Sequence, residues 1–160
     1  MKPITGLTKD NIKNIKLICF DVDGVTVERG TEIEETETTL NVKTHTLSGE
    51  LLKKLQELKK HFIIAVSSGR SLLYLTRMYS ALLWDRVALQ GENGIFTLMD
   101  GQVIQHEIFD KKTLQQLRNM FVDLRGLGKE NKDFRGFEPK QFLITVHAWR
   151  ELPEVERIVK

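Results

Sequence analysis

Two carboxylates stand one residue apart, directly after an apolar run, in the stretch LICFDVDGV at residues 17–25. Alternate residues of an extended chain point the same way, so Asp21 and Asp23 would repel each other unless a cation lay between them. Carboxylate oxygens are the hard ligands that Mg²⁺ prefers in proteins. The pair therefore predicts a magnesium site with Asp21 and Asp23 as ligands.

A second polar stretch, SSGR at residues 67–70, follows the apolar run FIIAV. Ser68 offers a hydroxyl and Gly69 an unobstructed backbone amide, and a helix predicted from Ser71 directs its first amides at the same place, which favours a phosphate. Arg70 is either a contact to the phosphate or to the second part of the chain, or only a surface charge, and Ser68 could instead cap the helix. An aspartate beside a metal can act as a nucleophile, and a second carboxylate can act as general acid and base, so the two stretches predict phosphoryl chemistry.

The elements that must position these residues alternate along the first part of the chain. Short apolar runs at 16–20, 62–66 and 87–90 predict buried strands, and amphipathic spacing predicts helices over 49–60, capped by Ser48, and after Ser71. This order is typical of a parallel α/β sheet, whose ligands lie beyond the carboxyl ends of the strands. Cys19 lies inside the first run, and we expect a buried, inert thiol.

The pattern changes at GENG, residues 91–94, where Asn93-Gly94 suits a hinge turn with positive φ. We expect an α/β part over 1–90 and an antiparallel α+β module over 91–160. The module should contain, in order, a hairpin closed by Asp100-Gly101, a helix capped by Asp110, a loop over 125–136, a strand over 142–149 and a helix from Pro153. In the first part, residues 28–46 predict a hairpin or flap, with the acidic stretch 31–39 in solvent.

Four stretches resemble the haloacid dehalogenase-like hydrolases, in the branch whose cap follows the third strand and which includes sugar-phosphate phosphatases, trehalose-phosphate phosphatases and phosphomannomutases. FDVDGV and IIAVSSGR are similar to the first two motifs of that family. GENGIFTLMDGQVI resembles the start of the cap, and FEPKQFLITVHAWR resembles a cap segment with a Glu-x-Lys pair followed by a strand ending in His and Arg. The resemblance implies a Rossmann-like core and a C2B-type α+β cap, both partial.

Carried over, the resemblance implies that Asp21 is the nucleophile and a Mg²⁺ ligand, and that Asp23 is the general acid and base, with its carbonyl on the metal. Ser68 would hold the phosphate, with Gly69 and Arg70 beside it. The residues expected to face the substrate from the cap are Asn93, Glu138, Lys140, His147 and Arg150. The alternatives are a surface ion pair for Glu138 and Lys140 on one strand face, and an ordinary half-buried histidine at position 147.

The chain departs from the family in one respect. The family needs a later lysine and a later acidic pair that completes the magnesium shell, and nothing after Gly94 fits either motif. We therefore expect the front part of a longer enzyme, in which the strand at 17–20 becomes an exposed apolar sheet edge. That edge predicts self-association, or a missing C-terminal half that covers it.

Composition limits the partners. The chain has 160 residues and a formal charge of +2, which favours neither nucleic acid nor a membrane surface, and its single cysteine is typical of a reducing, cytoplasmic compartment. The expected function is a Mg²⁺-dependent phosphatase that acts on a phosphorylated sugar through an aspartyl-phosphate. The alternatives are a phosphosugar mutase of the same fold, a non-catalytic truncated fragment and, less suited to the module after residue 91, a receiver-type signalling domain.

Overall fold

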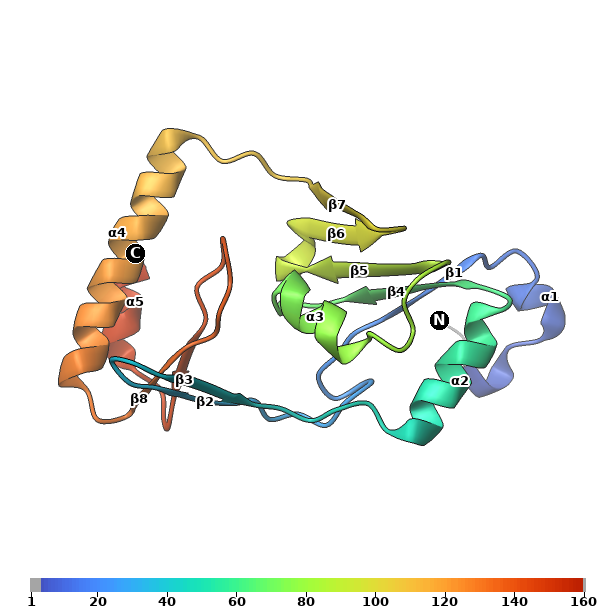
Figure 1. Ribbon diagram of the computed structural model, residues 1–160, viewed down its shortest axis with the longest axis horizontal. Helices are drawn as coiled ribbons and strands as arrows, with labels where there is room; N and C mark the ends of the chain where they lie inside the picture. The colour runs from blue at the N-terminus through green and yellow to red at the C-terminus, as the bar shows by residue number, and fades with distance from the viewer. Residues whose placement is uncertain (1–3, 160) are drawn as a thin grey trace.

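A five-stranded sheet forms the centre of the computed structural model, which describes residues 4–159 (Figure 1). Its first three strands are parallel, and the last two continue it as an antiparallel hairpin. In spatial order the strands are β1 (Leu17–Phe20), β4 (Ile63–Ser67), β5 (Val87–Gly91), β6 (Phe96–Met99) and β7 (Gln102–Gln105). The predicted parallel α/β core is confirmed.

Helices α2 (Gly49–Lys59) and α3 (Leu72–Met78) cover the core sheet, packing against β4 and β5 respectively. Ser48 and Ser71 cap them as predicted, because each hydroxyl accepts a hydrogen bond from a backbone amide of the first turn. The apolar face of α2 buries Leu55, and that of α3 buries Leu75. Two short N-terminal helices, η1 (Ile4–Gly6) and α1 (Lys9–Ile12), precede β1.

The hairpin of β6 and β7 belongs to the core sheet. Asp100 and Gly101 form its two-residue turn, both with positive φ (49° and 78°), which matches the twist of the flanking strands. Because β6 pairs with β5, the sheet continues beyond residue 91, where we expected the second module to begin. In Figure 1 the chain leaves β7 through an extended connection before it reaches α4.

The second module, as the structure has it, begins at residue 111 and lies at the left of Figure 1. It consists of α4 (Lys111–Glu130), β8 (Phe134–Phe137), β9 (Val146–Ala148) and α5 (Pro153–Val159). Asp110 caps α4 and α5 begins at Pro153, as predicted. The loop predicted over 125–136 is wrong, since α4 continues to Glu130 and β8 follows it. Gly128 lies within this helix, where its missing side chain leaves room for Phe134. A Cβ at position 128 would lie 2.7 Å from the Phe134 ring, so the glycine lets that ring pack on α4.

The predicted hairpin in the first part forms, and most of the acidic stretch 31–39 is exposed as expected, but Ile33 and Glu35 of β2 are covered. Strands β2 (Glu32–Glu35) and β3 (Leu40–Lys43) pair in antiparallel register, and β2 packs against β8. Ile33 is completely buried, and the Glu35 carboxylate accepts a hydrogen bond from the Phe137 amide at 3.0 Å. Gly136 allows this approach, since a Cβ there would lie 2.6 Å from Cβ of Glu35. The exposure predicted from the Glu and Thr residues holds for Glu32, Glu34 and 36–39, whereas Ile33 and Glu35 are covered because β2 packs against the distant strand β8.

Strand β1 lies at one edge of the described sheet, where only β4 pairs with it. Leu17 is 48% exposed and Cys19 is also exposed, so the expectation of a buried thiol is wrong. The predicted exposed edge is present in residues 4–159. None of the helices described there is long and apolar enough to cross a membrane.

Candidate active site

The turns that follow β1 and β4 lie side by side. Phe20 pairs with Val66 in parallel register, so the segments that follow β1 and β4 leave the sheet at the same edge. After β5, the Glu92 amide donates to the Arg70 carbonyl (2.8 Å) and the Asn93 amide donates to the Ser68 carbonyl (3.0 Å). The structure thus brings the three predicted strand-end segments, DVDGV, SSGR and GENG, into one place.

Asp21 is exposed, and its Oδ1 accepts a hydrogen bond from the Val22 amide at 2.6 Å. The loop behind it is held by Thr26, which is buried and whose hydroxyl lies 3.2 Å from the Asp21 carbonyl and 2.5 Å from the Tyr79 hydroxyl. Burial raises the pKa of Tyr79, so this phenol keeps its proton. Sequence reasoning missed Thr26 and Tyr79, since neither stands in a motif that bears on the chemistry.

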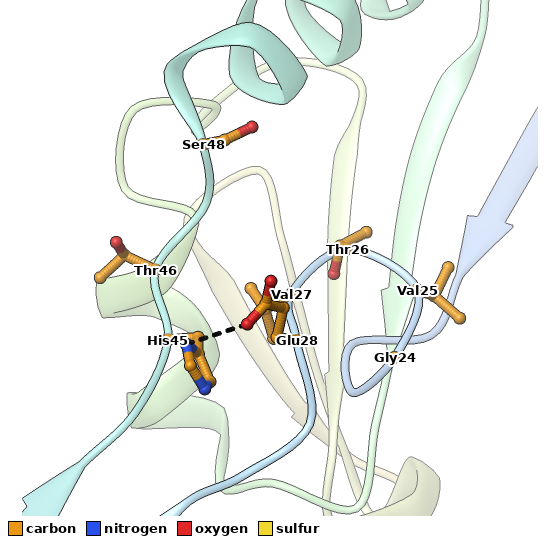
Figure 2. Close-up of a pocket in the computed structure, with 8 residues that line it drawn as sticks. All are labelled: Gly24, Val25, Thr26, Val27, Glu28, His45, Thr46 and Ser48. Atoms are coloured by element: carbon orange, nitrogen blue, oxygen red, sulfur yellow. Dashed lines mark ion pairs between the residues drawn. The ribbon is translucent and has the colours of Figure 1, made fainter.

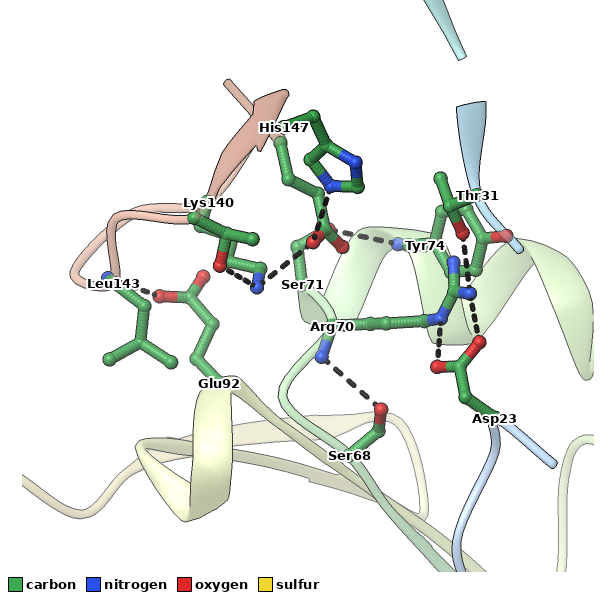
Figure 3. Close-up of polar contacts among 12 residues, drawn as sticks. Asp23, Thr31, Ser68, Arg70, Ser71, Tyr74, Glu92, Lys140, Leu143 and His147 are labelled. Atoms are coloured by element: carbon green, nitrogen blue, oxygen red, sulfur yellow. Dashed lines mark hydrogen bonds and ion pairs between the residues drawn. The ribbon is translucent and has the colours of Figure 1, made fainter. Parts of the chain in front are cut away.

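Asp23 makes a two-pronged ion pair with Arg70. Arg70 Nε lies 2.8 Å from Oδ2 of Asp23, and Nη2 contacts Oδ1 (Figure 3). Arg70 is 5% exposed, so the surface-charge alternative is wrong. Burial alone would lower the pKa of Arg70, but the hydrogen bond with Asp23 raises it above its ordinary value, and the guanidinium stays charged.

Arg70 also joins the core to the hairpin of β2 and β3. Its Nη2 donates to the Thr31 hydroxyl at 2.6 Å, its Nη1 lies 3.4 Å from the Thr44 hydroxyl, and its guanidinium carbon lies 4.4 Å from the centre of the Tyr74 ring. The Ser68 hydroxyl, nearly buried, accepts from the Arg70 amide at 3.3 Å. Gly69 gives the Asn93 side chain room, because a Cβ at position 69 would lie 3.0 Å from Oδ1 of Asn93, which would then have to shift.

Three of the predicted cap residues form a cluster, and Figure 3 shows two of them, Lys140 and His147, above Ser71 and Arg70 in that view. Lys140 Nζ lies 3.0 Å from Oε2 of Glu138, and His147 Nε2 lies 3.8 Å from the same oxygen. The side chains of Lys140 and Glu138 are only 5% and 11% exposed, so the surface-pair alternative is wrong. Glu138 and Lys140 lie outside the strands, because β8 ends at Phe137 and β9 begins only at Val146. The strand predicted over 142–149 is limited to Val146–Ala148.

The remaining cap candidates separate. Asn93 lies in the turn beside Gly69, in a left-handed conformation with φ of 55°. Arg150 does not join the cluster: its side chain is 78% exposed and its Nε donates to Oδ2 of Asp133 at 2.5 Å. A pocket of about 290 Å³ adjoins the cluster between α4 and the segment after β8, and its lining includes Glu138, Lys140 and Arg118.

Another pocket, of about 620 Å³, lies beside the loop at residues 21–27 that carries Asp21 and Asp23, the aspartate loop. Figure 2 shows the residues that line it. Its lining consists of Gly24, Val25, Thr26, Val27, Glu28, His45, Thr46 and Ser48. Nδ1 of His45 lies 3.9 Å from Oε2 of Glu28, and both side chains are exposed. None of the predicted site residues lines this pocket.

The donor set for a magnesium ion is incomplete. Mg²⁺ requires near-octahedral oxygen ligation, and among residues 4–159 no three acidic, histidine or cysteine side chains gather in one place. The Asp23 carboxylate is engaged by Arg70, which leaves the Asp21 carboxylate and backbone carbonyls such as that of Asp23. The described residues therefore do not make up a magnesium site by themselves.

Solved structures share this fold. The C-terminal domain of C. albicans trehalose-6-phosphate phosphatase matches with a TM-score of 0.63 and 20% identity, over 89% of this chain and 46% of that one. A trehalose-6-phosphate phosphatase related protein matches with a TM-score of 0.52 and 19% identity, over 78% of this chain and 48% of that one. A haloacid dehalogenase-like hydrolase from B. subtilis matches with a TM-score of 0.50 and 21% identity, over 69% of this chain and 34% of that one. No family model and no curated protein matches the sequence.

These likenesses confirm the predicted fold class, an α/β core of the haloacid dehalogenase-like type. The chain spans less than half the length of each of these three solved chains.

Proposed function

We propose that this chain supplies the nucleophile and the substrate-facing cluster of a phosphomonoesterase that acts on a phosphorylated sugar. The observation that carries the proposal is the largely buried cluster of Glu138, Lys140 and His147, in which Glu138 interacts electrostatically with Arg70. Figure 3 shows Lys140 and His147 above the turn that holds Ser68 and Arg70 in that view. A carboxylate and an ammonium held in fixed geometry suit sugar hydroxyls, and hydroxyl and amide donors at the strand ends suit a phosphate.

In this proposal an oxygen of Asp21 attacks phosphorus and the bond from phosphorus to the sugar oxygen breaks. Asp23 gives a proton to the leaving oxygen, then takes one from the water that hydrolyses the aspartyl-phosphate. Asp23 now accepts hydrogen bonds from Arg70, so it must turn away from that guanidinium before it can donate a proton. We expect magnesium dependence, with solvent or a second copy of the chain supplying the remaining ligands, and a reducing, cytoplasmic setting in which Cys19 stays a thiol.

The test is phosphate release from a panel of phosphosugars, with and without Mg²⁺, comparing the wild-type chain with Asp21→Asn and Asp100→Asn. Asp100 lies in the distant β6–β7 turn with positive φ, which asparagine tolerates, so it serves as the matched control. We expect release that requires Mg²⁺, disappears in Asp21→Asn and persists in Asp100→Asn. Release that survives in Asp21→Asn, or no release from any phosphosugar, would overturn the proposal for this chain.

A further inference from the structure

Glu92 is a completely buried carboxylate that the proposed chemistry does not use. It begins the short helix η2 (Glu92–Gly94), directly after β5, and has a left-handed backbone conformation with φ of 51°. Because β5 and β6 on either side of it are neighbours in the core sheet, Glu92 belongs to the core. A glutamate is almost never fully buried unless other groups satisfy its charge.

The groups that satisfy it come from the second module. Oε1 of Glu92 accepts from the Gln141 amide at 2.9 Å, and Oε2 accepts from the Phe142 amide at 2.8 Å and the Leu143 amide at 3.2 Å. Figure 3 shows the contact with Leu143. Hydrogen bonds to an ionised acceptor are about twice as strong as neutral ones. Three consecutive amides of one loop are therefore gathered by a single carboxylate of the core.

The same loop carries the substrate-facing cluster. Lys140 directly precedes the three amides, and its Nζ donates to the Thr145 hydroxyl at 2.6 Å, which closes the loop on itself. His147 follows in β9. Where the three amides are held therefore decides where Lys140 and His147 lie relative to the strand-end turns.

A second contact docks the same loop on the core. The ring of Phe142 stacks on that of Phe96 in β6, with centroids 5.7 Å apart, and packs at 4.7 Å against Phe109 in the connection to α4. Phe96 is 6% exposed. This aromatic contact sets the side of the loop that faces the core, whereas the Glu92 carboxylate fixes its backbone.

We propose that Glu92 is a positioning residue, a tether of the core that holds loop 141–143 and thereby places Glu138, Lys140 and His147 over the strand ends. Its role in recognising a phosphosugar rests on the proposed function, whereas the tether itself can be tested without any activity. A tether of this kind makes the second module rigid with respect to the core as long as the three amides stay bound.

The test is residue-level amide hydrogen exchange of the wild-type chain and of Glu92→Gln. Gln keeps the shape of the side chain but loses the charge and one acceptor oxygen, so we expect protection of the Gln141, Phe142 and Leu143 amides to fall about tenfold or more. Glu35→Gln is the matched control, because Glu35 accepts the Phe137 amide in the same module. It should expose Phe137 and leave 141–143 unchanged.

Unchanged protection at 141–143 in Glu92→Gln, with Phe137 exposed in Glu35→Gln, would overturn the tether. If Glu92→Gln does not fold, Glu92→Asp replaces it, since it keeps the charge on a shorter side chain. We expect weaker protection at the three amides there too, and wild-type protection would overturn the proposal.

A titration with glucose 6-phosphate as the probe, followed through the amide signals of Lys140 and His147, tests the consequence for recognition. We expect binding about tenfold weaker in Glu92→Gln than in the wild type and unchanged in Glu35→Gln. Equal binding in Glu92→Gln would overturn the positioning role. If the wild type binds neither glucose 6-phosphate nor any other phosphosugar of the panel, the proposed function fails, and the exchange experiment still decides the tether.

Discussion

Arg70 and Asp23 form the closest link between the two predicted chemical motifs, with Nε of one 2.8 Å from Oδ2 of the other. Arg70 is buried, whereas the Asp23 side chain is 37% exposed. The pair therefore stabilises the aspartate loop against the SSGR turn, apart from any part that Asp23 has in catalysis.

We expect Asp23→Asn to lower the free energy of unfolding by about 1–3 kcal/mol, because it leaves a buried guanidinium with a neutral partner. Asp21→Asn is the control: Asp21 is exposed and bonded only to the adjacent amide, so its cost should stay within about 0.5 kcal/mol. Urea denaturation at neutral pH measures both. Equal losses in the two variants would contradict the structural role of the pair.

The cluster of Glu138, Lys140 and His147 should make the free energy of unfolding depend on pH. Burial would raise the pKa of Glu138, but His147, Lys140 and Arg70 outweigh it and hold the pKa below its ordinary value of 4.5. A carboxylate with a depressed folded-state pKa contributes stability above its unfolded pKa, and this contribution is lost as the pH falls through the folded value.

We therefore expect the urea midpoint of the wild type to fall as the pH is lowered from 6 through 4.5 and below, and to fall less steeply in Glu138→Gln. Glu37→Gln, in the exposed turn of the β2–β3 hairpin, should keep the wild-type slope. Parallel curves for all three proteins would show that Glu138 is not held ionised by its neighbours.

Two glycines on α4 should respond in different ways to alanine. Gly126 has open space where a Cβ would be placed, so Gly126→Ala should raise the free energy of unfolding by roughly 0.5–1 kcal/mol through helix propensity. At Gly128 the same gain is opposed by the Phe134 ring, 2.7 Å from the added carbon, so we expect net destabilisation. Thermal unfolding of both variants checks this, and equal shifts would contradict the packing of Phe134 on α4.

The exposed edge at β1 should associate. An apolar strand with one unpaired side is a template for another strand, so we propose self-association through β1 when no further segment covers it. Light scattering of the chain at rising concentration should show masses above the monomer. Leu17→Lys, which places a charge on the edge, should restore the monomer.

Leu73→Lys provides the control for the edge, since Leu73 is 81% exposed on α3 and lies away from β1. We expect it to associate like the wild type. A monomer at every concentration in the wild type would remove the edge as an interaction surface.

Local signals predicted much of this structure. The apolar runs before Asp21 and Ser67 and the caps at Ser48, Ser71 and Asp110 depend on neighbours in sequence, and all were found. The misassigned segments depend on distant partners. Gly128 lies in a helix on which the distant Phe134 ring packs, and Ile33 is buried because β8 covers it.

The candidate site shows the same division. Motif residues such as Asp23 and Arg70 could be predicted from type and spacing, although their pairing could not. Glu92 lies in the GENG stretch, but its role depends on three backbone amides about 50 residues later. Backbone amides have no side-chain signature in the sequence.

The packing of the β2–β3 hairpin on β8 has a consequence for how the protein is made. The hydrogen bond between Glu35 and the Phe137 amide joins positions 102 residues apart, so the ribosome releases the hairpin long before its partner strand exists. Until β8 has been made, no strand covers the side chain of Ile33, so this apolar position of the hairpin stays exposed to water. A version of the chain that stops before residue 137 would leave it in that state permanently.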